Sequence, residues 1–144
     1  MQKDKLIFKQ KVWPNGMLSE NWTITKENGD DLLCMIPNAT LVFDYDPTFD
    51  GLTITCNQFV EKRLNEIIDQ AKEAIGNIHI NCIKNYKGQK QISLRLRDMG
   101  QTLPSLLALL KRGQKVEVVF HVKGISYARH QHYLTLALKD IKLI

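Results

Sequence analysis

Three segments in the C-terminal half of the chain alternate between apolar residues and polar or small ones: 90–98, 115–123 and 132–144. Because successive side chains of a β-strand point to opposite faces, each segment predicts a strand with one apolar face and one face that carries Arg, Lys, His or Tyr. Such strands suit a small closed or half-closed barrel, and they do not suit a parallel sheet buried on both faces. An ordinary two-faced antiparallel sheet explains the alternation equally well, although it does not explain why the outer face has so few acidic residues.

The first 56 residues contain short apolar or alternating runs that are separated by turn residues. These runs predict a strand meander over residues 5–13, 22–26, 32–36, 41–45 and 52–56. Pro-Asn-Gly, Asn-Gly-Asp, Pro-Asn and Asp-Pro sequences lie between them and supply the backbone angles that tight turns need. The N-terminal part is therefore expected to be a β meander.

Two helices are expected to interrupt the strands. Residues 58–75 carry apolar side chains at intervals of three and four, with Asn57 as the N-cap and Gly76 as the C-terminal stop. The second helix, residues 103–111, begins with Pro104 in its first turn, where a missing N–H costs little. Strands are expected over 77–86 and 90–99, joined by a hairpin turn at Lys87-Gly88-Gln89, and over 114–123 and 132–144, joined by the loop 124–131.

Composition indicates a single globular domain over residues 1–144. Hydrophobic residues make up 44% of the chain and charged residues 24%, which is close to the globular average. No apolar run approaches the ~20 residues that cross a bilayer, and the N-terminus lacks the sustained apolar stretch of a signal peptide. Three widely spaced cysteines, at positions 34, 56 and 82, predict reduced core thiols. We therefore expect a cytoplasmic protein that does not associate with a membrane.

Charge is distributed unevenly along the chain. Residues 1–76 contain 8 Lys and Arg against 12 Asp and Glu, whereas residues 77–144 contain 12 against 3. A basic half of this kind is typical of proteins that bind a polyanion, although a solvated basic face is the simpler explanation.

The stretch 87–144 reads KGQKQISLRLRDMGQTLPSLLALLKRGQKVEVVFHVKGISYARHQHYLTLALKDIKLI. Its order of strand, short helix, GQxVxVxFxVxG, hairpin and closing strand resembles the second half of the OB domains of single-stranded DNA-binding proteins. The resemblance implies an α+β, mainly β fold, in which residues 77–144 form an OB-like antiparallel barrel core. The meander 1–56 then contributes to the barrel or packs on it. Because only two strands fall between the two helices, the first barrel strand is expected at 52–56 or 41–45, with the 58–75 helix as an insertion.

Binding of a single strand needs cations that follow the backbone and flat side chains on which bases stack. The candidate cations are Lys84, Lys87, Lys90, Arg95, Arg97, Lys115, Lys123, Arg129, Lys139 and Lys142. The candidate stacking residues are Tyr86, Tyr127 and Tyr133, followed by His121, His130 and His132. The segment 125–133 is the best single candidate, because it combines two Tyr, two His and one Arg where the resemblance places a ligand-gripping loop.

These patterns predict a non-enzymatic protein that binds single-stranded nucleic acid with little sequence specificity. The resemblance favours DNA over RNA and implies a role in replication or recombination, with a second copy or a replication protein as a further partner. No cofactor and no metal are expected. The alternative is an OB-type subunit or adaptor that binds other proteins.

One segment suggests an enzyme. Residues 41–48 read LVFDYDPT, which resembles the DxDxT motif of haloacid-dehalogenase-type phosphatases, with Asp44 as the implied nucleophile and Asp46 as the implied acid–base. The parallel sheet and the downstream acidic pair of that family are missing from the sequence, and an acidic turn is the simpler interpretation. A metal site at Asp44, Asp46 and Asp50 is conceivable, whereas His130 and His132 lack an evident third ligand.

Overall fold

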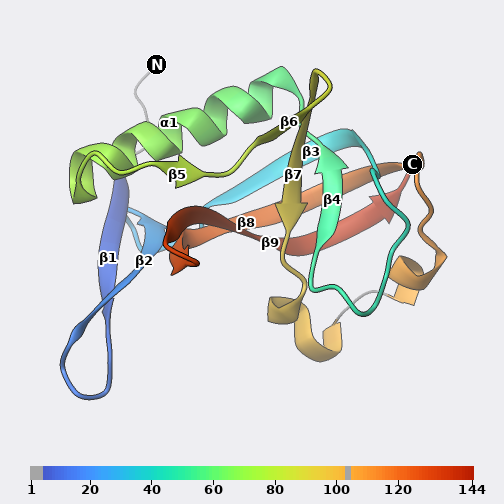
Figure 1. The fold of residues 1–144 in the computed structure, drawn as a ribbon. Coiled ribbons are helices and arrows are strands. Elements are labelled where there is room, and N and C mark those ends of the chain that lie inside the picture. The colour runs from blue at the N-terminus through green and yellow to red at the C-terminus, as the bar shows by residue number, and fades with distance from the viewer. Residues whose placement is uncertain (1–4, 103–104) are drawn as a thin grey trace.

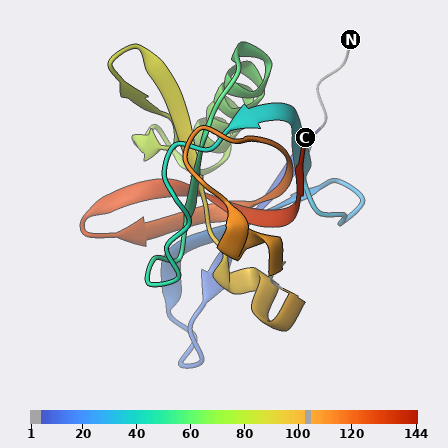
Figure 2. The ribbon, with the colours of Figure 1, turned by 90° about the vertical axis from the view of Figure 1, so that its right-hand side faces the viewer.

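The computed structural model describes residues 5–102 and 105–144, which form a mostly β fold with one α-helix in the described part (Figure 1). In chain order the elements are β1 (Leu6–Val12), β2 (Leu18–Lys26), β3 (Leu33–Thr40), β4 (Leu52–Thr55), α1 (Gln58–Ile75), β5 (Ile80–Asn81), β6 (Lys84–Tyr86), β7 (Gln89–Leu94), β8 (Lys115–Ala128) and β9 (Gln131–Leu143). Two 3₁₀ turns, η1 (Arg97–Thr102) and η2 (Ser105–Leu109), lie between β7 and β8. Figures 1 and 2 place α1 at one end of the sheets and the 3₁₀ turns at the other.

The strands form two sheets, and neither sheet is closed. The larger sheet has the order β1-β2-β8-β9-β5, with β3 also paired to β8, and the smaller has the order β4-β7-β6. All pairs are antiparallel except β5 with β9. Isolated bridges connect the sheets at Leu41 with Ile54 and at Arg95 with Ala137, and the second bridge is parallel. The predicted mainly β fold is therefore confirmed, and the described strands form two open sheets.

Helix α1 has the predicted bounds, because its caps satisfy its free backbone groups. The side chain of Asn57 accepts a 2.9 Å hydrogen bond from the backbone N–H of Val60, and Gly76 ends the helix at φ 117°, which favours glycine. The predicted apolar face is buried at Val60, Leu64, Ile67 and Ala71. This face packs α1 against the larger sheet, at β1 and β3.

The predicted alternation in β8 is confirmed. Val116, Val118, Phe120 and Val122 are all fully buried, and they lie in one hydrophobic core that includes residues from α1 and from both sheets. In β9 the pattern breaks at Ala137, which is buried between two buried leucines because the β8–β9 register shifts nearby. One core therefore joins the helix and both sheets.

Several predicted N-terminal boundaries are wrong. β3 does not stop before Pro37 but continues to Thr40, because a bulge between Ile36 and Ala39 accommodates the proline, which has no N–H. Residues 41–45 are not a strand, since only Leu41 forms a bridge. The chain instead leaves the sheet there and runs as a loop to β4.

C-terminal boundaries also differ from the prediction. Residues 77–86 split into β5 and β6, which pair with different sheets. The expected strand 90–99 ends at Leu94. Its hairpin turn is confirmed, with positive φ at Lys87 and Gly88 as a tight turn requires.

The loop expected at 124–131 is mostly strand, because β8 and β9 pair up to a two-residue turn at Arg129 and His130, both with positive φ. Of the expected helix 103–111, residues 103 and 104 lie outside the described part of the chain. Residues 105–109 form a 3₁₀ turn rather than an α-helix. Leu107 and Leu110 are buried three positions apart, the period of that helix type, and the N–H of Leu110 bonds to the carbonyl of Leu107. In the described residues, no helix has the length and apolar character that a bilayer crossing needs.

Candidate functional site

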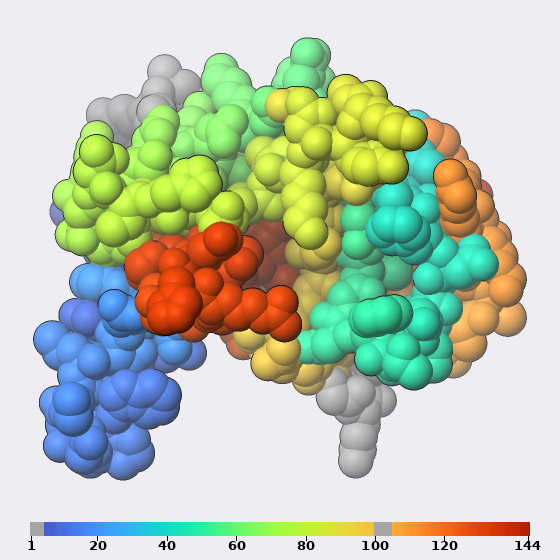
Figure 3. Space-filling model, viewed as in Figure 1, coloured from blue at the N-terminus to red at the C-terminus, as the bar shows by residue number. Residues whose placement is uncertain are grey.

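A groove of about 680 Å³ lies between the tip of the β8–β9 hairpin and the face of β4 and β7. Figure 3 shows this hollow beside the orange-red hairpin tip and below the yellow β6–β7 segment. Residues from the start of β5, from β9 and from the loop after β3 line it, so segments that are distant in the sequence meet here. The groove brings β4, β7 and β9 together and is the centre of the candidate site.

One wall of the groove is a chain of hydrogen bonds between β5 and β9. The side-chain amide of Asn81 donates to the carbonyl of His132 (2.9 Å) and to Oε1 of Gln131 (3.3 Å), and the hydroxyl of Tyr133 donates to the same Oε1 (3.1 Å). Nε2 of His79 lies 3.2 Å from Oδ1 of Asn81. This network holds the Tyr133 ring at the rim, where the residue is 37% exposed.

The part of the groove that lies on β4 and β7 is polar, whereas Ile80, Leu134 and Leu136 are among its apolar lining residues. Thr53 of β4 and Ser93 of β7 are cross-strand partners, and their hydroxyl oxygens lie 3.2 Å apart. Gln91 is buried, and its side-chain amide donates to Gln89 at 2.8 Å. Hydroxyl and amide groups can accept and donate hydrogen bonds, so this polar part suits a ligand with polar edges.

The opposite wall is Phe43, whose side chain is 61% exposed. Two hydrogen bonds hold the segment that carries Phe43. The N–H of Val42 donates to the carbonyl of Thr53 at 3.0 Å, and the Asp44 carboxylate accepts from the N–H of Arg112 at 2.7 Å. The ring is therefore presented to solvent by a segment that is tied on both sides.

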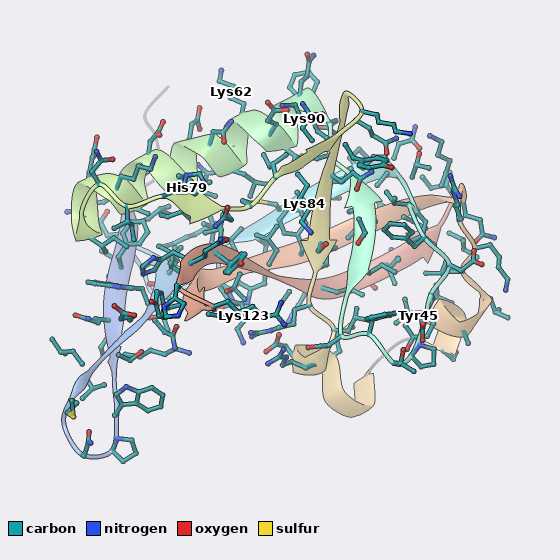
Figure 4. All side chains as sticks on the ribbon, viewed as in Figure 1. Tyr45, Lys62, His79, Lys84, Lys90 and Lys123 are labelled. Carbon is teal, nitrogen blue, oxygen red and sulfur yellow. The ribbon has the colours of Figure 1, made fainter. Side chains whose placement is uncertain are left out.

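A second hollow, of about 730 Å³, adjoins the groove and shares Phe43, Lys84 and Gln91 with it. Tyr86, which is 62% exposed, and Arg112 lie on its far side. Lys84 thus lies between the two hollows (Figure 4). Together the two hollows place two cations among three exposed aromatic rings.

Four further predicted residues gather around Asp98, one just after β7 and the others on β8 and β9. Asp98 accepts from Nε and Nη2 of Arg95 at 2.7 and 3.0 Å and from Nζ of Lys123 at 2.7 Å. These bonds, the Arg95 ones first, hold the pKa of Asp98 well below its usual value. His121 and Lys139 line a hollow of about 290 Å³ beside the same carboxylate.

The remaining predicted residues occupy three other positions. At the hairpin tip, the rings of Tyr127 and His132 have centroids 4.9 Å apart, and the Tyr127 hydroxyl lies 3.4 Å from Nδ1 of His130. Arg129 is exposed at the same turn, and Lys142 is exposed near the end of β9. Nζ of Lys87 lies 5.4 Å from the centre of the Tyr86 ring.

Three predicted cations contact partners away from the groove. Lys90 pairs with Glu61 at 3.9 Å, Arg97 bonds to Asp50, and Nζ of Lys115 donates to Thr40 at 2.6 Å. The predicted residues thus form a groove set (Lys84, Tyr86, Tyr133), an Asp98 set and a hairpin-tip set rather than one evenly lined surface.

Sequence reasoning missed Phe43, Arg112, Asn81 and Gln131, which all line the hollows. Phe43 falls in the predicted strand 41–45 and in the phosphatase-like motif, and neither pattern marked it as a binding residue. No sequence pattern pointed to Asn81 and Gln131, because these two amides are hydrogen-bonded to each other from distant strands.

The two aspartates of the DxDxT segment, Asp44 and Asp46, and the nearby Asp50 each bind a separate partner. Asp44 accepts from Arg112, and Asp50 accepts from the N–H of Leu96 at 3.1 Å. Asp46 accepts from the N–H and the hydroxyl of Thr48, which lowers its pKa. In residues 5–102 and 105–144, no three His, Cys, Asp or Glu side chains are grouped so that they could hold a metal ion. The sheet is also mostly antiparallel, unlike the parallel sheet that the phosphatase resemblance implies.

The cysteines are free thiols packed against the core, as predicted. Burial is the main cause that raises the pKa of Cys34, of Cys56 to about 11 and of Cys82 to about 12. Because the thiolate is the nucleophile, these thiols are unreactive near neutral pH.

A scan against protein-family models and searches of curated proteins and of solved structures found no match to this chain.

Proposed function

We propose that this protein binds single-stranded nucleic acid, chiefly DNA, with little sequence specificity, and that it serves replication or recombination. The observation that carries the proposal is the position of Lys84 between the exposed rings of Tyr133, Phe43 and Tyr86 along two adjoining hollows. Cations among solvent-facing rings are the arrangement that single-strand binders use.

The order of strands supports an OB-type architecture. The paired strands and the isolated bridges together give a circuit of neighbouring strands. It runs β3, β4, β7, β9, β8 and back to β3, and the β7–β9 bridge is parallel. A partly open five-stranded Greek-key barrel accommodates this circuit. In this proposal α1 is an insertion between the second and third strands. The first strand is β3, and neither 41–45 nor 52–56 takes that position.

The location of the groove supports the same proposal. OB folds bind oligonucleotides across their second and third strands, between the loop after strand one and the loop before strand five. The corresponding parts here are β4 and β7, the segment 41–51, and the Arg129-His130 turn. The groove lies across β4 and β7, with Phe43 on one side and Gln131 on the other.

In this mechanism bases stack on the rings, and Lys84 and Arg112 neutralise backbone phosphates. Stacking on an aromatic side chain contributes roughly 1–3 kcal/mol per base and accepts any base, which explains low specificity. The amide and hydroxyl groups of the groove add hydrogen bonds to base or sugar edges.

The test is fluorescence anisotropy of labelled oligo-dT over a range of salt concentrations, with duplex DNA and oligo-U as competitors. The double variant Phe43→Ala, Tyr86→Ala is expected to lose most of its affinity for oligo-dT. Trp13→Ala is the matched control, because Trp13 is also exposed (56%) but follows β1 at the turn of the β1–β2 hairpin and lines neither hollow. Equal competition by duplex, or equal loss in the control, would contradict the proposal.

The alternative is a protein-binding OB-type subunit or adaptor. A third hollow, of about 480 Å³, favours it, because Phe43 and Phe49 line it beside Asp44 and Asp46. An apolar, acidic hollow suits a basic peptide rather than a nucleic acid. Failure to bind any oligonucleotide at low salt would favour this alternative.

A further inference from the structure

We propose that a small hollow between the β1–β2 hairpin and the β8–β9 hairpin is a seat for one backbone phosphate. Lys11, Arg95 and Lys123 line it, together with the hydroxyl residues Thr23, Ser126 and Thr135. The inference rests on the proposed function, because it assigns one phosphate of the bound strand to a defined place. It also adds Lys11, which no sequence pattern singled out.

Close packing of two strands brings the three cations together. Lys11 comes from β1, Arg95 follows β7 and Lys123 comes from β8. Gly124 pairs with Thr23 of β2, and a Cβ at Gly124 would lie 1.9 Å from the carbonyl oxygen of Trp22. Only glycine therefore lets β2 lie so close to β8, and this contact sets the base of the β1–β2 hairpin beside Lys123.

The hollow has a strongly positive lining. It contains three cations, and none of its lining residues is acidic. Asp98 lies beside it and binds Arg95 and Lys123, but it uses two of the five N–H donors of Arg95 and one of the three of Lys123. The side chain of Lys11 is exposed and makes no hydrogen bond or ion pair with a residue in the described part of the chain. Asp98 thus orients two cations whose remaining donors stay available.

Size and hydroxyl groups favour a phosphate. The hollow measures about 50 Å³, which is room for roughly three or four water-sized atoms and too little for a base or a sugar ring. Ser126 and Thr135 share a hydrogen bond with their hydroxyl oxygens 2.5 Å apart, so the hydroxyl that accepts in this pair keeps its own O–H to donate to an oxyanion.

The hollow continues the groove. Ser93 and Tyr133 line the groove, whereas Arg95 and Thr135 line the hollow, each two residues further along its own segment. Two residues of a strand span about 6.8 Å, a distance suited to the step from one nucleotide to the next. A strand whose base stacks on Tyr133 therefore places a neighbouring phosphate at the seat.

The first test compares Lys11→Gln with Lys62→Gln in oligo-dT binding. Lys62 is an exposed cation on α1, on the opposite side of the molecule from Lys123 in Figure 4. Lys11→Gln should weaken binding about threefold to tenfold at low salt and reduce the slope of log K against log salt by about 0.7, the value for one single-strand phosphate. Lys62→Gln should change neither. If the wild-type protein binds and the two variants behave alike, the seat is wrong and the proposed function stands.

The second test needs no nucleic acid. Inorganic phosphate is titrated into the protein, with amide chemical shifts as the readout and sodium chloride at equal ionic strength as the control. Saturable shifts are expected at Gly124, Ser126 and Thr135, and they should be lost in Lys11→Gln. If phosphate shifts these amides but oligo-dT does not bind, the proposed function fails and the anion seat survives. Shifts no larger than those with chloride would overturn the seat.

Discussion

The carboxylate of Asp44 accepts a 2.7 Å hydrogen bond from the backbone N–H of Arg112, a residue 68 positions further along the chain. The bond ties the loop after β3 to the turn before β8, and it sets Phe43 and Arg112 on the border of the same hollow. The acidic segment that resembles a phosphatase motif therefore has a structural role, which is to fix an aromatic wall.

This bond can be tested with two variants of Asp44. Asp44→Ala removes the acceptor and should cost about 0.5–1.5 kcal/mol of stability, with a several-fold loss of oligo-dT affinity as Phe43 becomes mobile. Asp44→Asn keeps an acceptor oxygen and should bind nearly as well as the wild type. Urea denaturation and anisotropy measure the two effects. A phosphatase activity that Asp44→Asn abolishes would instead support the enzyme hypothesis.

Gly124→Ala should be strongly destabilising. Its Cβ would overlap the backbone oxygen of Trp22, which belongs to a paired strand and cannot move aside cheaply. We expect a loss of roughly 1–3 kcal/mol or more in the free energy of unfolding, as for overpacked cores. Gly51→Ala is the control, because its Cβ would meet its nearest neighbour, the carbonyl oxygen of Leu94, at 3.9 Å. Equal urea midpoints for the two variants would show that the strand contact is looser than described.

Removing the N-cap of α1 should have a moderate effect. Asn57→Ala loses the 2.9 Å bond to the N–H of Val60 and should cost about 1 kcal/mol, whereas Asn57→Ser should retain most of the stability. Two α1 residues, Asn65 and Ile68, line the groove, but they lie about two turns beyond the cap. Oligo-dT affinity at a temperature where both variants are folded should therefore not change. A loss of affinity in Asn57→Ala alone would indicate that fraying of α1 reaches the groove.

Stability should fall as the pH drops through the range near 6. Burial is the first cause that lowers the pKa of His121, and Lys123 and Lys139 add to it, while Asp31, 3.6 Å away, and Asp98 oppose it. A histidine with a lowered folded pKa takes up a proton more readily when unfolded. Its contribution is therefore complete above the unfolded pKa, about 6.5, and is lost as the pH falls from there toward the folded value.

The thermal midpoint measured from pH 8 to pH 3 checks this dependence. His121→Gln should remove the decline near pH 6 but keep a second decline below about pH 4. That second decline belongs to Asp98, whose depressed folded pKa contributes stability that is lost once the pH drops below the unfolded value. A profile near pH 6 that is identical in wild type and His121→Gln would contradict the assignment.

Part of this architecture could be predicted from local patterns. The bounds of α1, its cap at Asn57 and the buried face of β8 follow from periodicity and from single capping residues. The β8–β9 turn was misplaced because Tyr, His and Arg were interpreted as loop residues, although the ladder continues through Tyr127. Cross-strand pairing overrode the local preference there.

The candidate site depended much more on the fold. Lys84, Tyr86 and Tyr133 were predicted from residue type and meet in adjoining hollows. Other predicted cations, among them Arg97 and Lys115, are held by Asp50 and Thr40 instead. Residue type indicates which side chains can bind a nucleic acid, but not which of them already have a partner.

The amino-acid order alone determined the bounds of α1 and the apolar faces of α1 and β8, because burial selects periodic apolar residues within a few turns or a single strand. Only the tertiary structure decided that Phe43 faces Tyr133 across a groove and that Lys11 joins Arg95 and Lys123. These side chains come together because distant strands cross and because β2 and β8 approach closely at Gly124. No local pattern encodes the distance between segments that lie about a hundred residues apart in the sequence.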